Sequence, residues 1–178
     1  TFSDAEFERR LGPLPFKYFR VVEAPLAGGA GGMEFPGLVT VGTALYRGAA
    51  DPSTALQGMP GMGQMQQLLE AMGGDAAPLA QLGQSLERTL EFTVAHEVAH
   101  QWWAHQVIGG NVQGAALMSE TLSQYSALMV MKKKYGEERM GRFLRYELDK
   151  YLGQRSFERK QEMPLMRVED QLYVYYNK

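Results

Sequence analysis

The feature that constrains this chain most is an apolar segment, residues 93–103, in which polar side chains recur at helical spacing. It reads Thr-Val-Ala-His-Glu-Val-Ala-His-Gln-Trp-Trp, and its valines, alanines and tryptophans predict a buried helix. His96 and His100 are four residues apart, so they lie on one face of such a helix. Because unpaired polar groups are costly to bury, the fold must supply partners for both imidazoles and for Glu97.

Two imidazoles at this spacing can share one metal ion. Zinc suits neutral imidazole nitrogen and supports hydrolysis without redox chemistry. Glu97 lies about 100° around the helix from His96, where it can reach a metal-bound water rather than the ion. The segment therefore predicts a zinc-dependent hydrolase with His96 and His100 as ligands and Glu97 as general base. Histidines at this spacing also occur by chance, but two of the three histidines of the chain belong to this pattern.

The third ligand follows by elimination, because a catalytic zinc usually takes three protein ligands and one water. Residues 101–119 contain no Asp, Glu or Cys, and the first carboxylate after the motif is Glu120. A helix–loop–helix return would bring Glu120 back against His100. His105 is the competitor, but it lies about 140° around the helix from His100, and a lone histidine there is more often a capping or surface residue. Glu120 is the favoured ligand.

Composition excludes several other classes of function. The 178 residues suffice for a single domain, and 18 basic residues against 20 acidic ones leave no basic stripe for nucleic acid. The chain has no cysteine and therefore no thiolate ligand, and no apolar run reaches the roughly 18 residues of a membrane span. It begins at Thr1 without a signal peptide, so we expect a domain of a longer protein, any targeting signal or membrane anchor lying elsewhere.

Hydrophobic periodicity and breaker residues predict the order of elements. The predicted elements are a helix over 4–10, strands over 16–23 and 38–42, a helix from 78 or 84 to 105, and helices over 115–135 and 137–152. Ser3 and Glu6 form a capping-box pattern before the first helix, and Gly136 is the expected C-cap between the last two.

Two sets of apolar residues and one stretch of unusual composition lead to further expectations. Phe7 and Leu11 should be the buried contacts of the first helix, and one side of the last helix should be buried through Met140, Phe143, Leu144, Leu148 and Tyr151. Residues 47–78, rich in Gly, Met, Gln, Ala and Pro, are expected to form a flexible surface insertion with a short helix over 62–72.

Three ordered motifs together resemble the M1 family of zinc aminopeptidases, which are gluzincins. They are Gly31-Gly32-Met33-Glu34, His96-Glu97-Val98-Ala99-His100-Gln101-Trp102-Trp103 and Ser119-Glu120. The amino-acid sequences around the last two motifs are most similar to those of bacterial members, some of which are fused to transporter-like membrane segments. The resemblance implies an α+β, thermolysin-like catalytic domain over 1–178, incomplete and without the family's flanking domains, in which a small N-terminal sheet precedes a helical zinc-binding part.

The resemblance also implies roles for individual residues. Glu34 would hold the α-amino group of a peptide substrate, with Gly32 and Met33 beside it, although a solvated loop carboxylate is the plainer interpretation of Glu34. Tyr176 would donate a hydrogen bond to the oxyanion, with Tyr175 as the near alternative and Tyr173 less favoured. A run of tyrosines near a chain end is as often packing.

Four departures from the family pattern stand out. Phe35 and His105 each stand where the family usually has Asn, and the 47–78 stretch is longer than usual. Nineteen residues separate His100 from Glu120 where eighteen are usual, and the loop at 109–110 is a plausible place for the extra one.

The sequence thus predicts an aminopeptidase that acts on peptides with one zinc ion. An inactive, metal-binding peptide-recognition domain attached to a membrane transporter is the first alternative. A gluzincin endopeptidase is the second, and a helical protein without metal is the least favoured.

Overall fold

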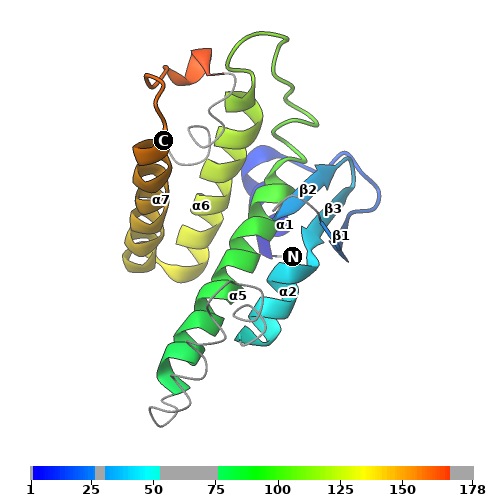
Figure 1. The fold of residues 1–178 in the computed structure, drawn as a ribbon. Helices are drawn as coiled ribbons and strands as arrows, with labels where there is room; N and C mark the ends of the chain where they lie inside the picture. Colours follow the sequence, from blue (N-terminus) through cyan, green and yellow to red (C-terminus); the bar gives the residue numbers. More distant parts are fainter. Residues whose placement is uncertain (1, 27–30, 53–75, 169–178) are drawn as a thin grey trace.

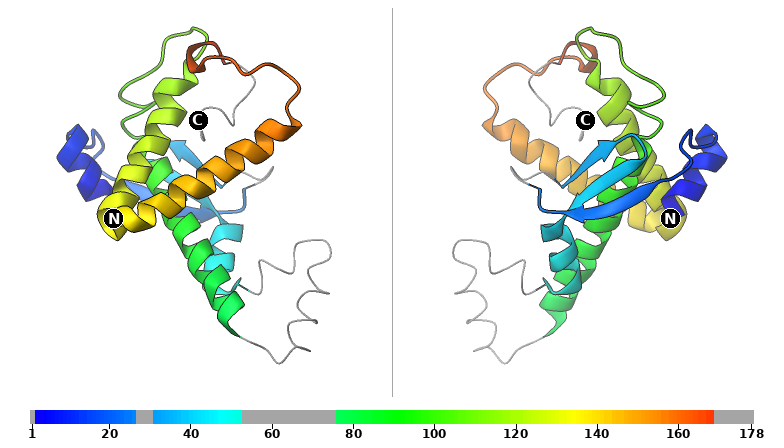
Figure 2. Two further views of the ribbon diagram at one scale, coloured as in Figure 1. Left: turned by 90° about the vertical axis from the view of Figure 1, so that its left-hand side faces the viewer. Right: turned by 90° about the vertical axis from the view of Figure 1, so that its right-hand side faces the viewer.

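A long helix lies between a small sheet and a helical layer in the computed structural model, which describes residues 2–26, 31–52 and 76–168 (Figures 1 and 2). Within this part the fold is α+β, as predicted, and no helix is long and apolar enough to cross a membrane. The elements are α1 (Phe2–Leu11), β1 (Arg20–Ala24), β2 (Gly32–Phe35), β3 (Leu38–Gly42), α2 (Thr43–Ala50), α5 (Ala76–Ala99), the π-helical turn η1 (Leu117–Thr121), α6 (Leu122–Tyr135), α7 (Glu137–Phe157) and the 3-10 turn η2 (Leu165–Arg167).

The sheet has the strand order β1-β3-β2, with β1 parallel and β2 antiparallel to β3. The prediction of a strand over 38–42 is confirmed. The first strand, predicted over 16–23, begins only at Arg20, because β3 offers five residues to pair with, from Leu38 to Gly42. Gly37, in the turn between β2 and β3, has a φ of 73°, which glycine adopts without the steric cost of a side chain.

Helix α5 ends at Ala99, so the prediction that it continues to residue 105 was wrong. The chain folds into a series of turns after His100, and the Ala104 N–H donates to the carbonyl of Val107 at 3.0 Å. Ala104 has a φ of 120°, a conformation that is strained for any residue with a side chain. Trp103 therefore lies outside the helix, and its carbonyl is available to a side chain.

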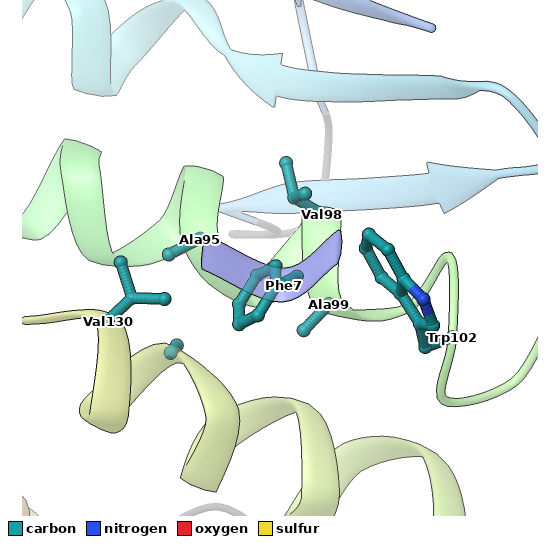
Figure 3. Close-up of a cluster of buried hydrophobic side chains, with 7 residues drawn as sticks. Phe7, Ala95, Val98, Ala99, Trp102 and Val130 are labelled. Atoms are coloured by element: carbon teal, nitrogen blue, oxygen red, sulfur yellow. The ribbon is translucent and has the colours of Figure 1, made fainter. Parts of the chain in front are cut away.

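The core forms where α1, α5 and α6 meet, as Figure 3 shows. Its buried members are Phe7, Ala95, Val98, Ala99, Trp102, Ala127 and Val130. The rings of Phe7 and Trp102 meet edge to face with centroids 5.6 Å apart, and the Trp102 indole N–H donates to the carbonyl of Gly12. The predicted burial of Phe7 is confirmed, whereas Leu11 is 36% exposed and does not join this core.

The expected capping box of α1 is not formed. The helix already begins at Phe2, and the carboxylate of Glu6 accepts hydrogen bonds from the guanidinium groups of Arg9 and Arg10, at 2.7 and 2.6 Å. Glu6 thus serves an ion-pair cluster within the helix instead of a helix cap.

The boundary between α6 and α7 agrees with the prediction, but the predicted burial of one side of α7 does not. Gly136 ends α6 with a φ of 83°, as expected of a C-cap glycine, and α7 continues beyond residue 152 to Phe157. Met140 is buried, but Leu144 and Leu148 are about half exposed, at 49% and 50%, because α7 diverges from α6 (Figure 2).

Part of the insertion predicted over 47–78 is regular structure. The end of α2 and the start of α5 both fall inside it, and α2, which was not predicted, packs against α5. The predicted helix over 62–72 lies outside the described residues.

Candidate metal centre

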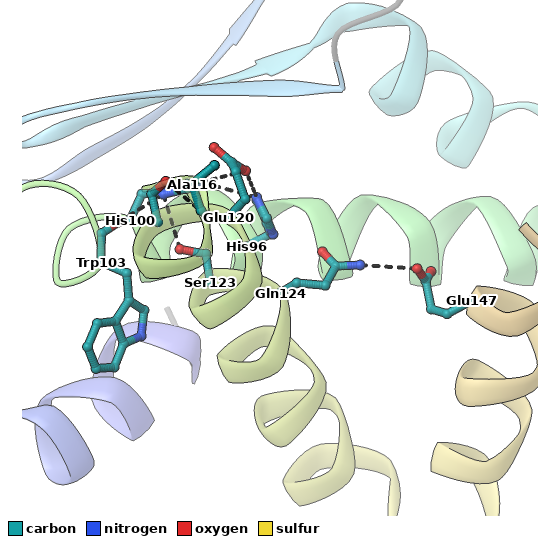
Figure 4. Close-up of polar contacts among 9 residues, drawn as sticks. His96, His100, Trp103, Ala116, Glu120, Ser123, Gln124 and Glu147 are labelled. Atoms are coloured by element: carbon teal, nitrogen blue, oxygen red, sulfur yellow. Dashed lines mark hydrogen bonds and ion pairs between the residues drawn. The ribbon is translucent and has the colours of Figure 1, made fainter. Parts of the chain in front are cut away.

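Three side chains converge where α5 ends and η1 passes over it. His96 and His100 come from α5 and the turn that follows it, and Glu120 comes from η1 (Figure 4). The two Nε2 atoms lie 3.1 Å apart, and Oε2 of Glu120 is 3.4 Å from that of His96 and 3.5 Å from that of His100. The three ligand atoms thus form a nearly equilateral triangle.

The size of this triangle fits a small tetrahedral ion. Zinc–nitrogen and zinc–oxygen bonds of about 2.0–2.2 Å place neighbouring tetrahedral ligands about 3.3–3.6 Å apart. The His96–Glu120 and His100–Glu120 separations fall in this range, and the separation of the imidazoles is slightly shorter. His96, His100 and Glu120 can therefore hold a metal ion, and the third position is filled by the glutamate that elimination favoured.

The imidazole of His100 is oriented by groups behind it. Its Nδ1 lies 2.9 Å from the carbonyl of Trp103 and 3.1 Å from the hydroxyl of Ser123. A carbonyl can only accept, so Nδ1 carries a proton, and with a metal bound Nε2 would present its lone pair to the ion. Sequence reasoning missed Ser123, although it lies one helical turn after Glu120 and could have been found from that spacing.

Glu120 and His100 shift each other's pKa values. Burial alone would raise the pKa of Glu120, but the hydrogen bonds with His100 and then His96 outweigh it and hold this pKa well below its usual range. Burial would lower the pKa of His100, whereas Glu120 raises it, with a net increase. Glu120 is therefore a carboxylate, the charged form in which it can ligate a metal.

Glu120 lies in a π-helical turn, Leu117–Thr121. Such turns are rare and are found frequently at functional sites, because they accommodate one additional residue in a helix. This turn is therefore an alternative to the loop at 109–110 as the location of the extra residue between His100 and Glu120.

Glu97 faces the sheet, on the side of α5 next to β2. It is 7% exposed, and a Cβ placed on Gly32 would stand 2.5 Å from its Cγ and its Oε1. Burial raises the pKa of Glu97 to about 8, with smaller increases from the charges of Glu34 and Glu120 against a decrease from His100. Gly32 therefore makes room for Glu97.

The alternation of β2 decides which of its residues reach the site. Gly32 and Glu34 are half-buried and line the cavity, whereas Met33 and Phe35 are 44% and 43% exposed. Carboxylate oxygens of Glu34 and Glu97 lie within 4.8 Å of each other and of a ring nitrogen of His100. The structure thus places Glu34 beside the metal centre and does not bring Met33 to it.

The side chain of Gln101 connects the metal-binding segment to the strand that carries Glu34. It is fully buried, accepts a hydrogen bond from the Gly37 N–H at 2.9 Å, and donates one to the carbonyl of Phe35 at 3.1 Å. These contacts join residues 64 and 66 positions apart, so no local pattern could have revealed them.

A cavity of about 640 Å³ begins at the metal-binding residues and continues along α5. Gly32 and Glu34 line it from β2, Thr89 and Phe92 from α5, and Phe143 from α7. The space is large enough for several atoms of a peptide beyond the metal.

The remaining candidates are His105 and three tyrosines near the C-terminus. Burial lowers the pKa of His105, which belongs to neither of the two groups of potential ligands in the described part of the chain. Tyr173, Tyr175 and Tyr176 lie outside the described residues.

Fold and site together define an α+β chain with a His-His-Glu group that can hold a metal ion. Comparison with protein-family models, curated proteins and solved structures gave no match.

Proposed function

We propose that this protein is a zinc-dependent aminopeptidase with a thermolysin-like, M1-type catalytic domain. The observation that carries the proposal is the triangle of His96, His100 and Glu120, with Glu97 on its β2 side. Hydrolysis by activated water needs these two parts, a metal with an open position and a base that is not a ligand.

A bound zinc ion supplies two effects, a lower pKa for water and polarisation of the scissile carbonyl. Glu97 accepts the proton of the attacking water and returns it to the leaving amine. Burial raises the pKa of Glu97 to about 8, which suits a group that takes up and releases a proton near neutral pH. Tyr176 is the proposed donor to the oxyanion, with Tyr175 as the alternative.

Glu34 gives the site its preference for the end of a chain. A carboxylate at this position pairs with the positive α-amino group of a free N-terminus and leaves an internal peptide bond without that interaction. Ligand atoms of Glu34, Glu97 and His100 lie within 4.8 Å of one another. In this position Glu34 would bind the amino group of a substrate whose scissile bond follows its first residue. This favours an aminopeptidase over an endopeptidase.

The test combines metal analysis with hydrolysis of aminoacyl-anilides. The protein should bind one zinc ion and cleave these substrates, and acetylation of their amino group should abolish cleavage. Glu97→Gln should keep the zinc and lose hydrolysis by at least about a hundredfold.

Three outcomes would contradict the proposal. Cleavage by Glu97→Gln at the rate of the parent would exclude Glu97 as the base. Cleavage of acetylated substrates would indicate an endopeptidase, and zinc binding without any turnover would indicate a peptide-recognition domain.

A further inference from the structure

Glu147, from α7, is a buried carboxylate that lines the cavity and has no part in the proposed mechanism. It is 7% exposed, and its Oε2 accepts a hydrogen bond from Nε2 of Gln124 at 3.1 Å (Figure 4). A carboxylate that lines a binding cavity can form a charge-assisted hydrogen bond with a cationic group of the ligand, in addition to the contacts that it makes within the protein.

Strand β2 and helix α5 run in the same direction. A Cβ on Gly31 would contact Thr93, one on Gly32 would meet Glu97, and the Gly37 N–H binds Gln101. Glu34 therefore lies toward the C-terminal end of α5.

The cavity extends the other way, toward the N-terminal end of α5. It reaches Arg88, which precedes His96 by eight residues, or about 12 Å of helix. A peptide with its amino group at Glu34 and its first peptide bond at the metal places its second residue in this part of the cavity.

The carboxylate of Glu147 is linked to the metal-binding residues through Gln124, which lies one helical turn after Glu120. Gln124 follows Glu120 by four residues, about 6 Å along the helix, and Glu147 lies one hydrogen bond beyond it. A lysine ammonium extends roughly 6 Å from its own Cα, and that Cα lies roughly 2.5 Å from the scissile carbonyl carbon.

The walls between the metal and Glu147 suit the alkyl part of such a side chain. The rings of Phe92 and Phe143 stack with centroids 6.2 Å apart, and both line the cavity. Aromatic walls pack against the methylene groups of Lys or Arg, while the charged end proceeds to the carboxylate.

Three arginines also line the cavity, and each contacts another side chain of the protein. Arg88 donates to Gln84, Arg142 donates to Glu138, and the guanidinium of Arg139 lies over the ring of Tyr135. The side chain of Arg142 is 74% exposed, so solvent screens its charge far more than that of the buried Glu147.

We propose that Glu147 makes this cavity a specificity pocket for a lysine or arginine side chain at the second residue of the peptide. The proposal rests on the proposed function for the direction of the substrate. The substrates are then peptides with a free amino group and a lysine or arginine as the second residue.

The test compares the tripeptides Ala-Lys-Ala and Ala-norleucine-Ala, which differ by one ammonium group. The parent should show a kcat/KM at least about tenfold higher for the lysine peptide, and Glu147→Gln should reduce this ratio to below about twofold. Asp149→Asn, which removes an exposed carboxylate two residues further along α7, is the matched control and should keep the ratio. Glu147→Asp, which keeps the charge on a shorter side chain, should retain part of it.

Binding separates this proposal from the proposed function. Zinc-loaded Glu97→Gln should bind Ala-Lys-Ala at least about tenfold more tightly than the norleucine peptide in calorimetry, and addition of Glu147→Gln should remove the difference. Charge-dependent binding without hydrolysis by the parent would support the pocket and contradict the peptidase.

Hydrolysis of both peptides at equal rates by the parent would support the peptidase and contradict the pocket. Three further results would overturn the pocket: no binding of either peptide, a parent preference that Glu147→Gln leaves intact, and a Glu147-dependent preference for Lys-Ala-Ala, which would place the basic side chain at the first residue.

Discussion

Gly32 and Glu97 are in such close contact that no other residue fits at position 32 without moving the carboxylate. A Cβ there would stand 2.5 Å from both Cγ and Oε1 of Glu97, well inside van der Waals contact. The strand and the helix therefore approach each other at the one side chain that is proposed to move the proton. Two of the three sequence motifs are linked by this contact.

Gly32→Ala should displace Glu97 while leaving the zinc ligands in place. A shift of about 1 Å in a general base can lower the rate about a hundredfold, so we expect kcat to fall by that order with one zinc still bound. Gly31→Ala is the matched control, because a Cβ there meets Thr93 at an ordinary 3.5 Å. Equal kcat values for Gly32→Ala and the parent would show that Glu97 is not constrained by β2.

Gln101 should set the distance between Glu34 and the metal. Gln101→Leu leaves the Gly37 N–H and the Phe35 carbonyl without their buried partner, which should lower the free energy of unfolding by about 2–4 kcal/mol. Because the amine anchor is then less well placed, KM for substrates with a free amino group should rise more than kcat falls. Steady-state kinetics with chemical denaturation would measure both.

The control for Gln101 lies in the same turn. The side chain of Gln106 is exposed and donates to the carbonyl of Gln101, so Gln106→Ala should change neither KM nor stability by a comparable amount. A loss of stability in Gln101→Leu without any change in KM would make Gln101 a purely structural residue.

Local patterns contained much of this fold but not the contacts that join its parts. The strand over 38–42, the buried helix around His96 and the glycine cap at residue 136 each follow from a few neighbouring residues. The link from Gln101 to the β2–β3 turn spans more than sixty residues and has no periodic signature.

Periodicity also misled where the partner of a helix face was unknown. Leu144 and Leu148 occur at the spacing of a buried face, yet they are about half exposed because α7 diverges from α6. At the site, the spacing of the histidines and the elimination of other carboxylates sufficed to predict that Glu120 lies with the two imidazoles. The backbone turn that lets the Trp103 carbonyl orient His100 could not be predicted, because it depends on where α5 ends.

The affinity for zinc should depend on Glu120 and not on His105. Glu120→Gln removes the charged ligand and should weaken zinc binding by at least about a hundredfold, whereas His105→Gln should keep one zinc per chain. Ser123→Ala removes a group that contacts His100 from behind and should weaken binding about tenfold. Competition with a chromophoric chelator would measure all three, and the loss of zinc in His105→Gln would reassign the third ligand.

Acid should destabilise α1 through Glu6. Hydrogen bonds from Arg9 and then Arg10 lower the pKa of Glu6 from 4.5 to about 2 in the folded protein. The unfolded chain therefore binds this proton at higher pH, so the stabilisation is fully present above about pH 4.5 and is lost as the pH falls toward 2. Glu6→Gln should be less stable than the parent at neutral pH, and the difference should shrink on acidification.

Arg9 and Arg10 have side chains 61% and 41% exposed, so about 1 M salt should reduce the same difference in stability at neutral pH. Urea denaturation across this pH range would measure it, and a difference independent of both pH and salt would mean that the three residues do not act through charge.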